Sequence, residues 1–125
     1  MPSYAKVLFD LIQNKEYTFY KLVIDDVCHF DEFVREIEKI PRDLSQLKGI
    51  YALMDRFSSH IKLPNTKFRK IKGITRGDVF EFKKGAIRVY VILMEPDVYV
   101  VTGSMKNDQD KTIKRFDKKI KDFKP

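Results

Sequence analysis

The chain has 125 residues, enough for one domain with a buried core. Hydrophobic residues make up 43% of it and charged residues 34%, which is ordinary for a soluble globular protein, and no apolar run is long enough to span a membrane. There is no signal-peptide pattern, and the single cysteine, Cys28, cannot form an internal disulfide. The sequence therefore predicts a protein of the reducing cytoplasm.

The net charge of +7 is unevenly distributed along the chain. Residues 1–61 carry 8 Lys and Arg against 10 Asp and Glu, whereas residues 62–125 carry 17 against 8. The basic excess therefore lies wholly in the second half, a distribution typical of proteins that bind a polyanion or an acidic protein. A lysine-rich surface that is merely solvated is the alternative.

The first half of the chain predicts one strand and two helices. Residues 1–16 fit a short helix, an edge strand or a loose terminus equally well, and residues 17–24 predict a β-strand. Apolar residues at helical spacing predict a helix over 30–40 and a second helix over 44–61, with Asp43 as its N-cap. Because the connection is short, we expect the helices to pack as an antiparallel hairpin.

The second half predicts a three-stranded meander. Three short β-prone runs are separated by a turn at Lys84-Gly85 and by a break at Glu95-Pro96-Asp97; they cover 79–82, 86–94 and 98–102. A basic linker precedes the meander, and a terminal helix follows it with an apolar face formed by Ile113, Phe116, Ile120 and Phe123. The sequence thus predicts a small single α+β domain over residues 1–125. Its helices cover one face of an antiparallel sheet built from the N-terminal strand and the meander.

One charged residue is out of place in the predicted middle strand. Arg88 lies among apolar residues, and a guanidinium on a central strand must reach water, a partner or a ligand. An ion pair with Glu81 on the facing strand would satisfy it. A bound phosphate would also satisfy it, because a guanidinium can donate two parallel, charge-assisted hydrogen bonds.

Four short stretches carry a resemblance to a known family. They are the basic lead-in KFRKIKG at 67–73, the strand VFEFK at 79–83, the strand opening IRVY at 87–90 and the segment VTGSMK at 101–106. In order and spacing they resemble the RelE/ParE superfamily, the toxin halves of bacterial type II toxin–antitoxin pairs. The resemblance covers residues 67–123 and is supported by the helix pair before them.

The resemblance implies a ribosome-associated mRNA interferase, an endoribonuclease that needs no metal or cofactor and uses the 2′-hydroxyl of the RNA as nucleophile. In this reading Arg88 stabilises the transition state, and Glu81 either accepts the 2′-hydroxyl proton or holds Arg88 in place. Lys106 either binds a phosphate or is a solvated lysine at a strand end. The basic residues expected to contact RNA or the ribosome are Lys83, Lys84, Arg69, Lys70, Lys111, Lys114, Arg115 and Lys118.

The chain departs from the family where proton transfer is concerned. Several ribonuclease members carry a general acid, a His near the end of the third strand or a Tyr or His in the last helix, and this sequence has neither. A non-enzymatic, ParE-like inhibitor of DNA gyrase is therefore an alternative, and a nucleic-acid or protein-binding module without toxicity is another. Under either toxin hypothesis we expect a cognate antitoxin that docks on the basic sheet and terminal helix.

Overall fold

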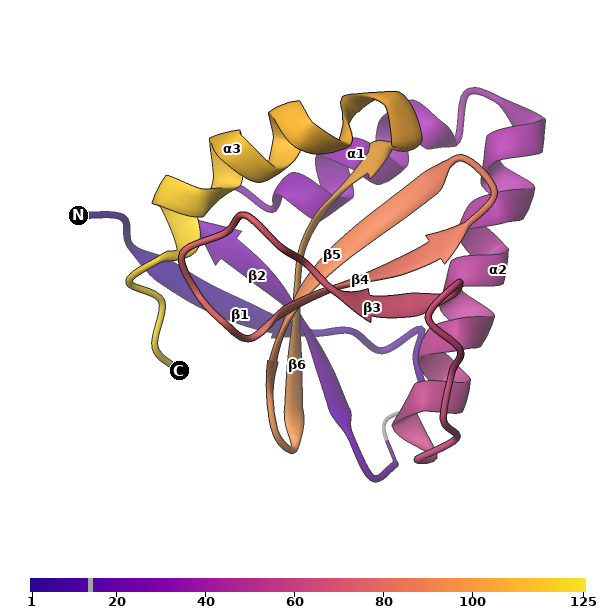
Figure 1. The fold of residues 1–125 in the computed structure, drawn as a ribbon, viewed down its shortest axis with the longest axis horizontal. Coiled ribbons are helices and arrows are strands. Elements are labelled where there is room, and N and C mark those ends of the chain that lie inside the picture. Colours follow the sequence, from indigo (N-terminus) through magenta and orange to yellow (C-terminus); the bar gives the residue numbers. More distant parts are fainter. Residues whose placement is uncertain (14) are drawn as a thin grey trace.

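The computed structural model describes residues 1–13 and 15–125 and confirms the α+β class (Figure 1). None of the helices in these ranges is both long and apolar enough to cross a membrane. The elements are β1 (Tyr4–Leu8), β2 (Thr18–Ile24), α1 (His29–Ile37), α2 (Pro41–Ser58), β3 (Phe68–Lys70), β4 (Val79–Lys84), β5 (Ile87–Met94), β6 (Asp97–Met105), the 3₁₀ turn η1 (Lys106–Asp108) and α3 (Gln109–Ile120).

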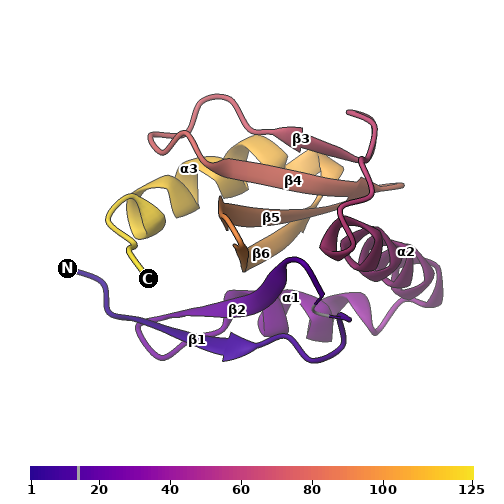
Figure 2. The ribbon, with the colours of Figure 1, turned by 90° about the horizontal axis from the view of Figure 1, so that it is seen from below.

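The strands form one sheet in the order β1-β2-β6-β5-β4-β3 (Figure 2). The predicted meander β4-β5-β6 is confirmed, and β2 lies inside the sheet between β1 and β6. The prediction of a wholly antiparallel sheet is wrong in one place, because β2 and β6 run parallel. Two strands extend the predicted set: β1 forms one edge, and β3, within the predicted linker, pairs with β4 at the other.

Strand alternation divides the core into two parts. On β5, Ile87, Val89 and Val91 face α1 and α2, whereas Tyr90 and Ile92 face α3. The terminal helix therefore covers the face opposite α1 and α2, and the prediction that all helices lie on one face is wrong. Because β5 is buried on both faces, it reads in the sequence as a nearly continuous apolar run.

The two helices of the first half lie near their predicted positions but not as a hairpin. Pro41 is the first residue of α2 and Ile40 is its N-cap, so Asp43 is not the cap but a buried residue of the first turn. Proline suits this position because the first helical N–H has no partner within the helix. In Figure 1, α1 runs behind the sheet near the top and α2 runs down the right side, so the two helices diverge.

Two close contacts fix these helices to the end of the sheet that carries Arg88. Phe33 of α1 packs on Gly103 of β6, where a Cβ would lie 2.4 Å from the ring. Gln46 of α2 accepts a hydrogen bond of 3.0 Å from the backbone N–H of Ala86 in the β4–β5 turn. Gly85 of that turn has a φ of 56°, a conformation that favours glycine.

The C-terminal segment is held by Arg76. Its Nη1 donates to the carbonyl oxygens of Ile120 at 2.8 Å and Phe123 at 2.7 Å, and its Nε and Nη2 donate to the Asp78 carboxylate at 2.9 and 3.0 Å. These hydrogen bonds lower the pKa of Asp78. The loop before β4 thereby ties the end of α3 to the sheet.

Candidate phosphate-binding site

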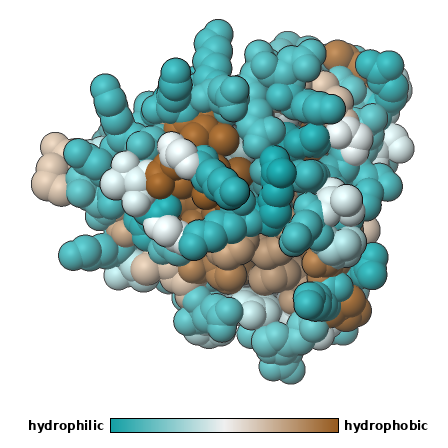
Figure 3. Space-filling model, viewed as in Figure 1, coloured by the Kyte–Doolittle hydropathy of each residue, from teal (hydrophilic) through white to brown (hydrophobic). Residues whose placement is uncertain are grey.

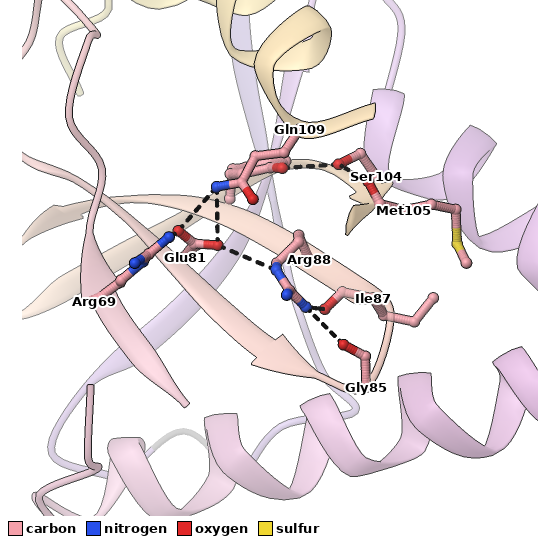
Figure 4. A network of polar contacts seen from close by, with 9 residues as sticks. Arg69, Glu81, Gly85, Ile87, Arg88, Ser104, Met105 and Gln109 are labelled. Carbon is pink, nitrogen blue, oxygen red and sulfur yellow. Dashed lines mark hydrogen bonds and ion pairs between the residues drawn. The ribbon is translucent and has the colours of Figure 1, made fainter. Parts of the chain in front are cut away.

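Glu81, in the middle of β4, is the centre of a polar cluster on the α3 face of the sheet (Figure 4). Its side chain is 0% exposed, and both carboxylate oxygens have partners. Arg69 Nε of β3 donates to Oε2 at 3.0 Å, and Arg88 Nε of β5 lies 3.5 Å from Oε1. Gln109 Nε2, at the start of α3, donates to both oxygens at 3.1 and 3.3 Å. The ion pair with Glu81, one of the two alternatives for Arg88, is present in the structure, and the buried charge of Glu81 has the partners that burial requires.

The Arg88 guanidinium is held in one orientation with one nitrogen left open. Nη1 donates to the carbonyl oxygens of Gly85 at 2.8 Å and Ile87 at 3.0 Å, while Nε faces Glu81. Within residues 1–13 and 15–125, no group accepts a hydrogen bond from Nη2. That nitrogen is not fully buried, because Asp43 Oδ1 is the one fully buried side-chain polar atom without a hydrogen-bond partner in those ranges. Arg88 is only 8% exposed, so its guanidinium is a fixed cation with one donor that is not already bonded.

Three further cations surround this arginine. Arg69 remains 50% exposed while its Nε binds Glu81. Lys83 is the neighbour of Arg88 in the strand register, and its pKa is lowered by burial and by the charges of Arg69, Arg88 and Lys106. Lys106 is exposed, and its backbone N–H donates to Ala86 O at 2.7 Å, beside the β4–β5 turn. We call Arg69, Lys83, Arg88 and Lys106, with Glu81 between them, the arginine cluster.

Polar groups that the sequence does not predict as functional lie beside the cluster. The only signal for Gln109 in the sequence is its position in the polar segment 107–110, where α3 begins. Tyr90 Oη lies 2.8 Å from Ser104 Oγ, and Ser104 Oγ also donates to the Met105 carbonyl oxygen at 3.0 Å. Because serine has a single hydroxyl proton, Tyr90 is the donor between the two hydroxyls. Burial raises the pKa of Tyr90 to about 12, so this tyrosine is a neutral residue packed in the core.

The two lysines predicted beside the cluster lie in different places. Lys70, on β3, lines a cleft of about 300 Å³ that adjoins the cluster. Lys84 follows Lys83 and therefore projects from the opposite face of the sheet. There its aliphatic chain lies over Gly49 of α2, where a Cβ would be 2.9 Å from Lys84 Cγ. Lys70 therefore borders the cleft beside the cluster, and Lys84 lies away from the cluster.

The four predicted cations of α3 divide into two pairs. Lys114 and Lys118 lie exposed on the helix, whereas Lys111 and Arg115 line a groove of about 520 Å³ between α1 and α3. The other residues of this α1–α3 groove are Phe33, Glu36, Ile37, Ile40, Asp43, Gly103, Ser104, Met105, Asp108 and Thr112.

Neither histidine belongs to the arginine cluster. His29, at the start of α1, lies 3.3 Å from a Glu32 oxygen and against the Phe116 ring, and burial lowers its pKa. His60 follows the end of α2 and faces Glu16 at 3.9 Å. In the part of the chain that the structure describes, no three His, Cys, Asp or Glu side chains are grouped so that they could hold a metal ion.

Comparisons of the chain with models of protein families, with curated proteins and with solved structures found no match.

Proposed function

We propose that the protein is the toxin component of a type II toxin–antitoxin system, and that it cleaves messenger RNA at the ribosome with the 2′-hydroxyl of the RNA as nucleophile. The observation that carries the proposal is the fixed Arg88 guanidinium, with an open Nη2 among three further cations. The resemblance of residues 67–123 to RelE/ParE toxins supports the same function.

The reaction calls for the kind of groups that the cluster contains. The 2′-oxygen attacks the adjacent phosphorus, the bond from phosphorus to the 5′-oxygen breaks, and the products are a 2′,3′-cyclic phosphate and a 5′-hydroxyl. One proton leaves the 2′-hydroxyl for a water molecule of the solvent acting as base, and another reaches the 5′-oxygen from an acid. Negative charge builds on the phosphate oxygens in the transition state, and Arg88 Nη2 and the exposed side of Arg69 are the donors that would stabilise it.

The residue roles follow from burial and contacts. We assign Glu81 to holding the two arginines in position, because both of its oxygens have partners and it is wholly buried. We assign Lys83 to proton donation to the 5′-oxygen, because it lies directly across the strand pair from Arg88 and because its lowered pKa makes its ammonium group a stronger acid than an ordinary lysine. Lys106, exposed at the rim, is assigned to an adjacent phosphate.

A toxin requires an antitoxin, and the α1–α3 groove is a suitable part of its docking surface. The groove combines apolar side chains, among them Phe33 and the exposed Ile40, with charges of both signs: the cations Lys111 and Arg115 and the carboxylates of Glu36, Asp43 and Asp108. An amphipathic segment that carries charges of both signs, with its acidic residues toward α3, would complement these features. This extends the predicted docking surface from α3 to the edge of α1.

The proposal is tested by inducing the protein briefly without an antitoxin and mapping new 5′ ends on cellular mRNA. Wild-type protein should produce new ends inside coding regions, and Arg88→Ala should abolish them. Arg35→Ala, an exposed arginine of α1, serves as the matched control and should leave cleavage unchanged. Growth arrest with intact mRNA would contradict the nuclease proposal.

Inhibition of DNA gyrase without nuclease activity is the second candidate. It is favoured by the position of both histidines outside the cluster and by the burial of Tyr90, whose hydroxyl is bonded to Ser104. Under this candidate, Arg88→Ala leaves toxicity intact, and the purified protein blocks supercoiling by gyrase. A protein that causes neither arrest nor cleavage would instead fit the predicted binding module without toxicity.

A further inference from the structure

A second hollow lies across β3 from the arginine cluster. It has a volume of about 450 Å³ and lies between the C-terminal end of α2 and strands β3 and β4. Phe68 and Phe80 form part of its wall, with rings stacked 5.0 Å apart and 5° from parallel. Phe57 of α2 packs against Phe68 at 4.8 Å. We call this the aromatic hollow.

Both rings are partly exposed: Phe68 lies on the edge strand β3, and Phe80 lies on the neighbouring strand β4. Phe82, the residue of β4 that pairs with Phe68, is 0% exposed in the core shared with α2. Figure 3 shows that hydrophobic side chains interrupt the hydrophilic surface in the region where β3 and β4 lie in Figure 1. Aromatic rings that remain partly open to water offer a flat surface on which a planar group can stack.

The charges around the hollow indicate an anionic ligand. Lys62, Arg69 and Lys70 line it, and none of the lining residues that the structure describes carries a carboxylate. A single-stranded nucleic acid combines the two features that this wall would recognise, a planar base and an anionic backbone. An acidic peptide would match the charge but would leave the stacked rings without a planar partner.

Arg69 joins the hollow to the arginine cluster. Its side chain lines the hollow, and its Nε binds Glu81 on the other face of the sheet. A nucleotide chain whose phosphate lies against Arg69 can therefore extend across the three-residue strand β3 and place a base in the hollow.

We propose that the aromatic hollow is a base-binding subsite for single-stranded RNA, in which one nucleobase stacks on the Phe68–Phe80 pair beside the phosphate held by Arg69. This inference rests on the proposed function, because it names a subsite that positions the same RNA for cleavage. Stacking tolerates any base, so the subsite adds affinity and register without selecting a sequence.

The test is the affinity for a fluorescein-labelled RNA of eight nucleotides, methylated at every 2′-oxygen so that it cannot be cut, measured by fluorescence anisotropy at low salt. Phe80→Leu should weaken binding about tenfold, equal to about 1.4 kcal/mol, whereas Phe80→Tyr should retain it. Phe33→Leu makes the same change at a partly exposed ring of the α1–α3 groove, and it should leave the affinity unchanged. Thermal melts confirm that each variant is folded.

Two further readouts separate stacking from charge. The chain has no tryptophan, so Phe80→Trp introduces a single indole whose fluorescence should be quenched by the bound base. An RNA made of abasic nucleotides should bind wild-type protein about tenfold more weakly than the full RNA and should not distinguish Phe80→Leu from wild type.

The inference is overturned if Phe80→Leu binds the RNA as tightly as wild type, if Phe33→Leu is the variant that loses binding, or if no variant binds the RNA. The proposed function is judged separately, by cleavage on ribosomes and its loss in Arg88→Ala. Cleavage by wild type together with unchanged RNA affinity in Phe80→Leu would remove the subsite and leave the function standing.

Discussion

Glu81→Gln is the substitution that most directly tests the physical basis of the arginine cluster. The change keeps the size of the side chain but removes the charge that Arg88 and Arg69 share. It also places a side-chain amide N–H₂ where an oxygen now accepts from a guanidinium or from Gln109. The two arginines are then left without their common counter-charge.

The magnitude follows from the exposure of each partner. Arg69 is 50% exposed, so water screens its charge and its pair contributes little. The Arg88 side chain is 9% exposed and Glu81 is 0% exposed, so their pair is a buried one, and breaking such a pair costs about 3–5 kcal/mol. Because glutamine keeps one acceptor, we expect the free energy of unfolding to fall by about 3 kcal/mol. This is a large part of the roughly 5–15 kcal/mol by which a typical domain is stable.

The assay is urea unfolding followed by circular dichroism. With a urea dependence of about 1.5 kcal/mol per molar, the midpoint should fall by about 2 M. Glu36→Gln, in an exposed pair with Lys39, is the matched control and should leave the midpoint nearly unchanged. Adding Arg88→Met to Glu81→Gln removes the unpaired guanidinium and should restore part of the stability. A Glu81→Gln protein as stable as wild type would show that the buried Glu81–Arg88 pair does not stabilise the fold.

Three further predictions concern the rest of the fold and the cluster rim. Hydrogen bonds from Arg76 lower the pKa of Asp78 in the folded protein. The Asp78 carboxylate therefore stabilises the fold above its unfolded pKa of about 3.9, and this contribution is lost as the pH falls through its folded pKa. Asp78→Asn should therefore melt below wild type at pH 7 and converge with it in acid, and a constant difference between the two across this range would contradict the prediction. Gly103→Ala should lower the free energy of unfolding by about 1–3 kcal/mol, because its Cβ would lie 2.4 Å from the Phe33 ring. Adding Phe33→Leu should recover part of this loss in urea unfolding. If it does not, contact with Phe33 is not the cause of the loss. Lys106→Ala should reduce the slope of log affinity for single-stranded RNA against log salt by about 0.7, the value for one phosphate contact, and an unchanged slope would exclude Lys106 from phosphate binding.

The elements predicted correctly from the sequence are those with local determinants. The meander β4-β5-β6 is encoded by β-prone runs, by Gly85 in a tight turn and by the break at Pro96. The same turn sets the register that brings Glu81 near Arg88, so their ion pair could be predicted before the fold was known.

The features that the sequence did not predict depend on contacts between distant segments. The parallel pairing of β2 with β6, and the side of the sheet that α3 covers, are decided by packing rather than by any local run. Strand β3 has only three residues, too few to show an alternating pattern. The contacts of Arg69 and Gln109 with Glu81 arise from the pairing of β3 and the docking of α3, so neither residue could be recognised as its partner.

We propose that the cluster around Arg88 cleaves RNA through the 2′-hydroxyl of the substrate. The most direct measurement incubates purified protein with ribosomes carrying a defined mRNA, maps the cleaved bond, and repeats the reaction with a single 2′-deoxynucleotide on the 5′ side of that bond. We predict a 2′,3′-cyclic phosphate product, no cleavage of the deoxy-substituted bond, and no cleavage of either mRNA by Arg88→Ala. Cleavage that persists at the deoxy-substituted bond, or in Arg88→Ala, would contradict the claim.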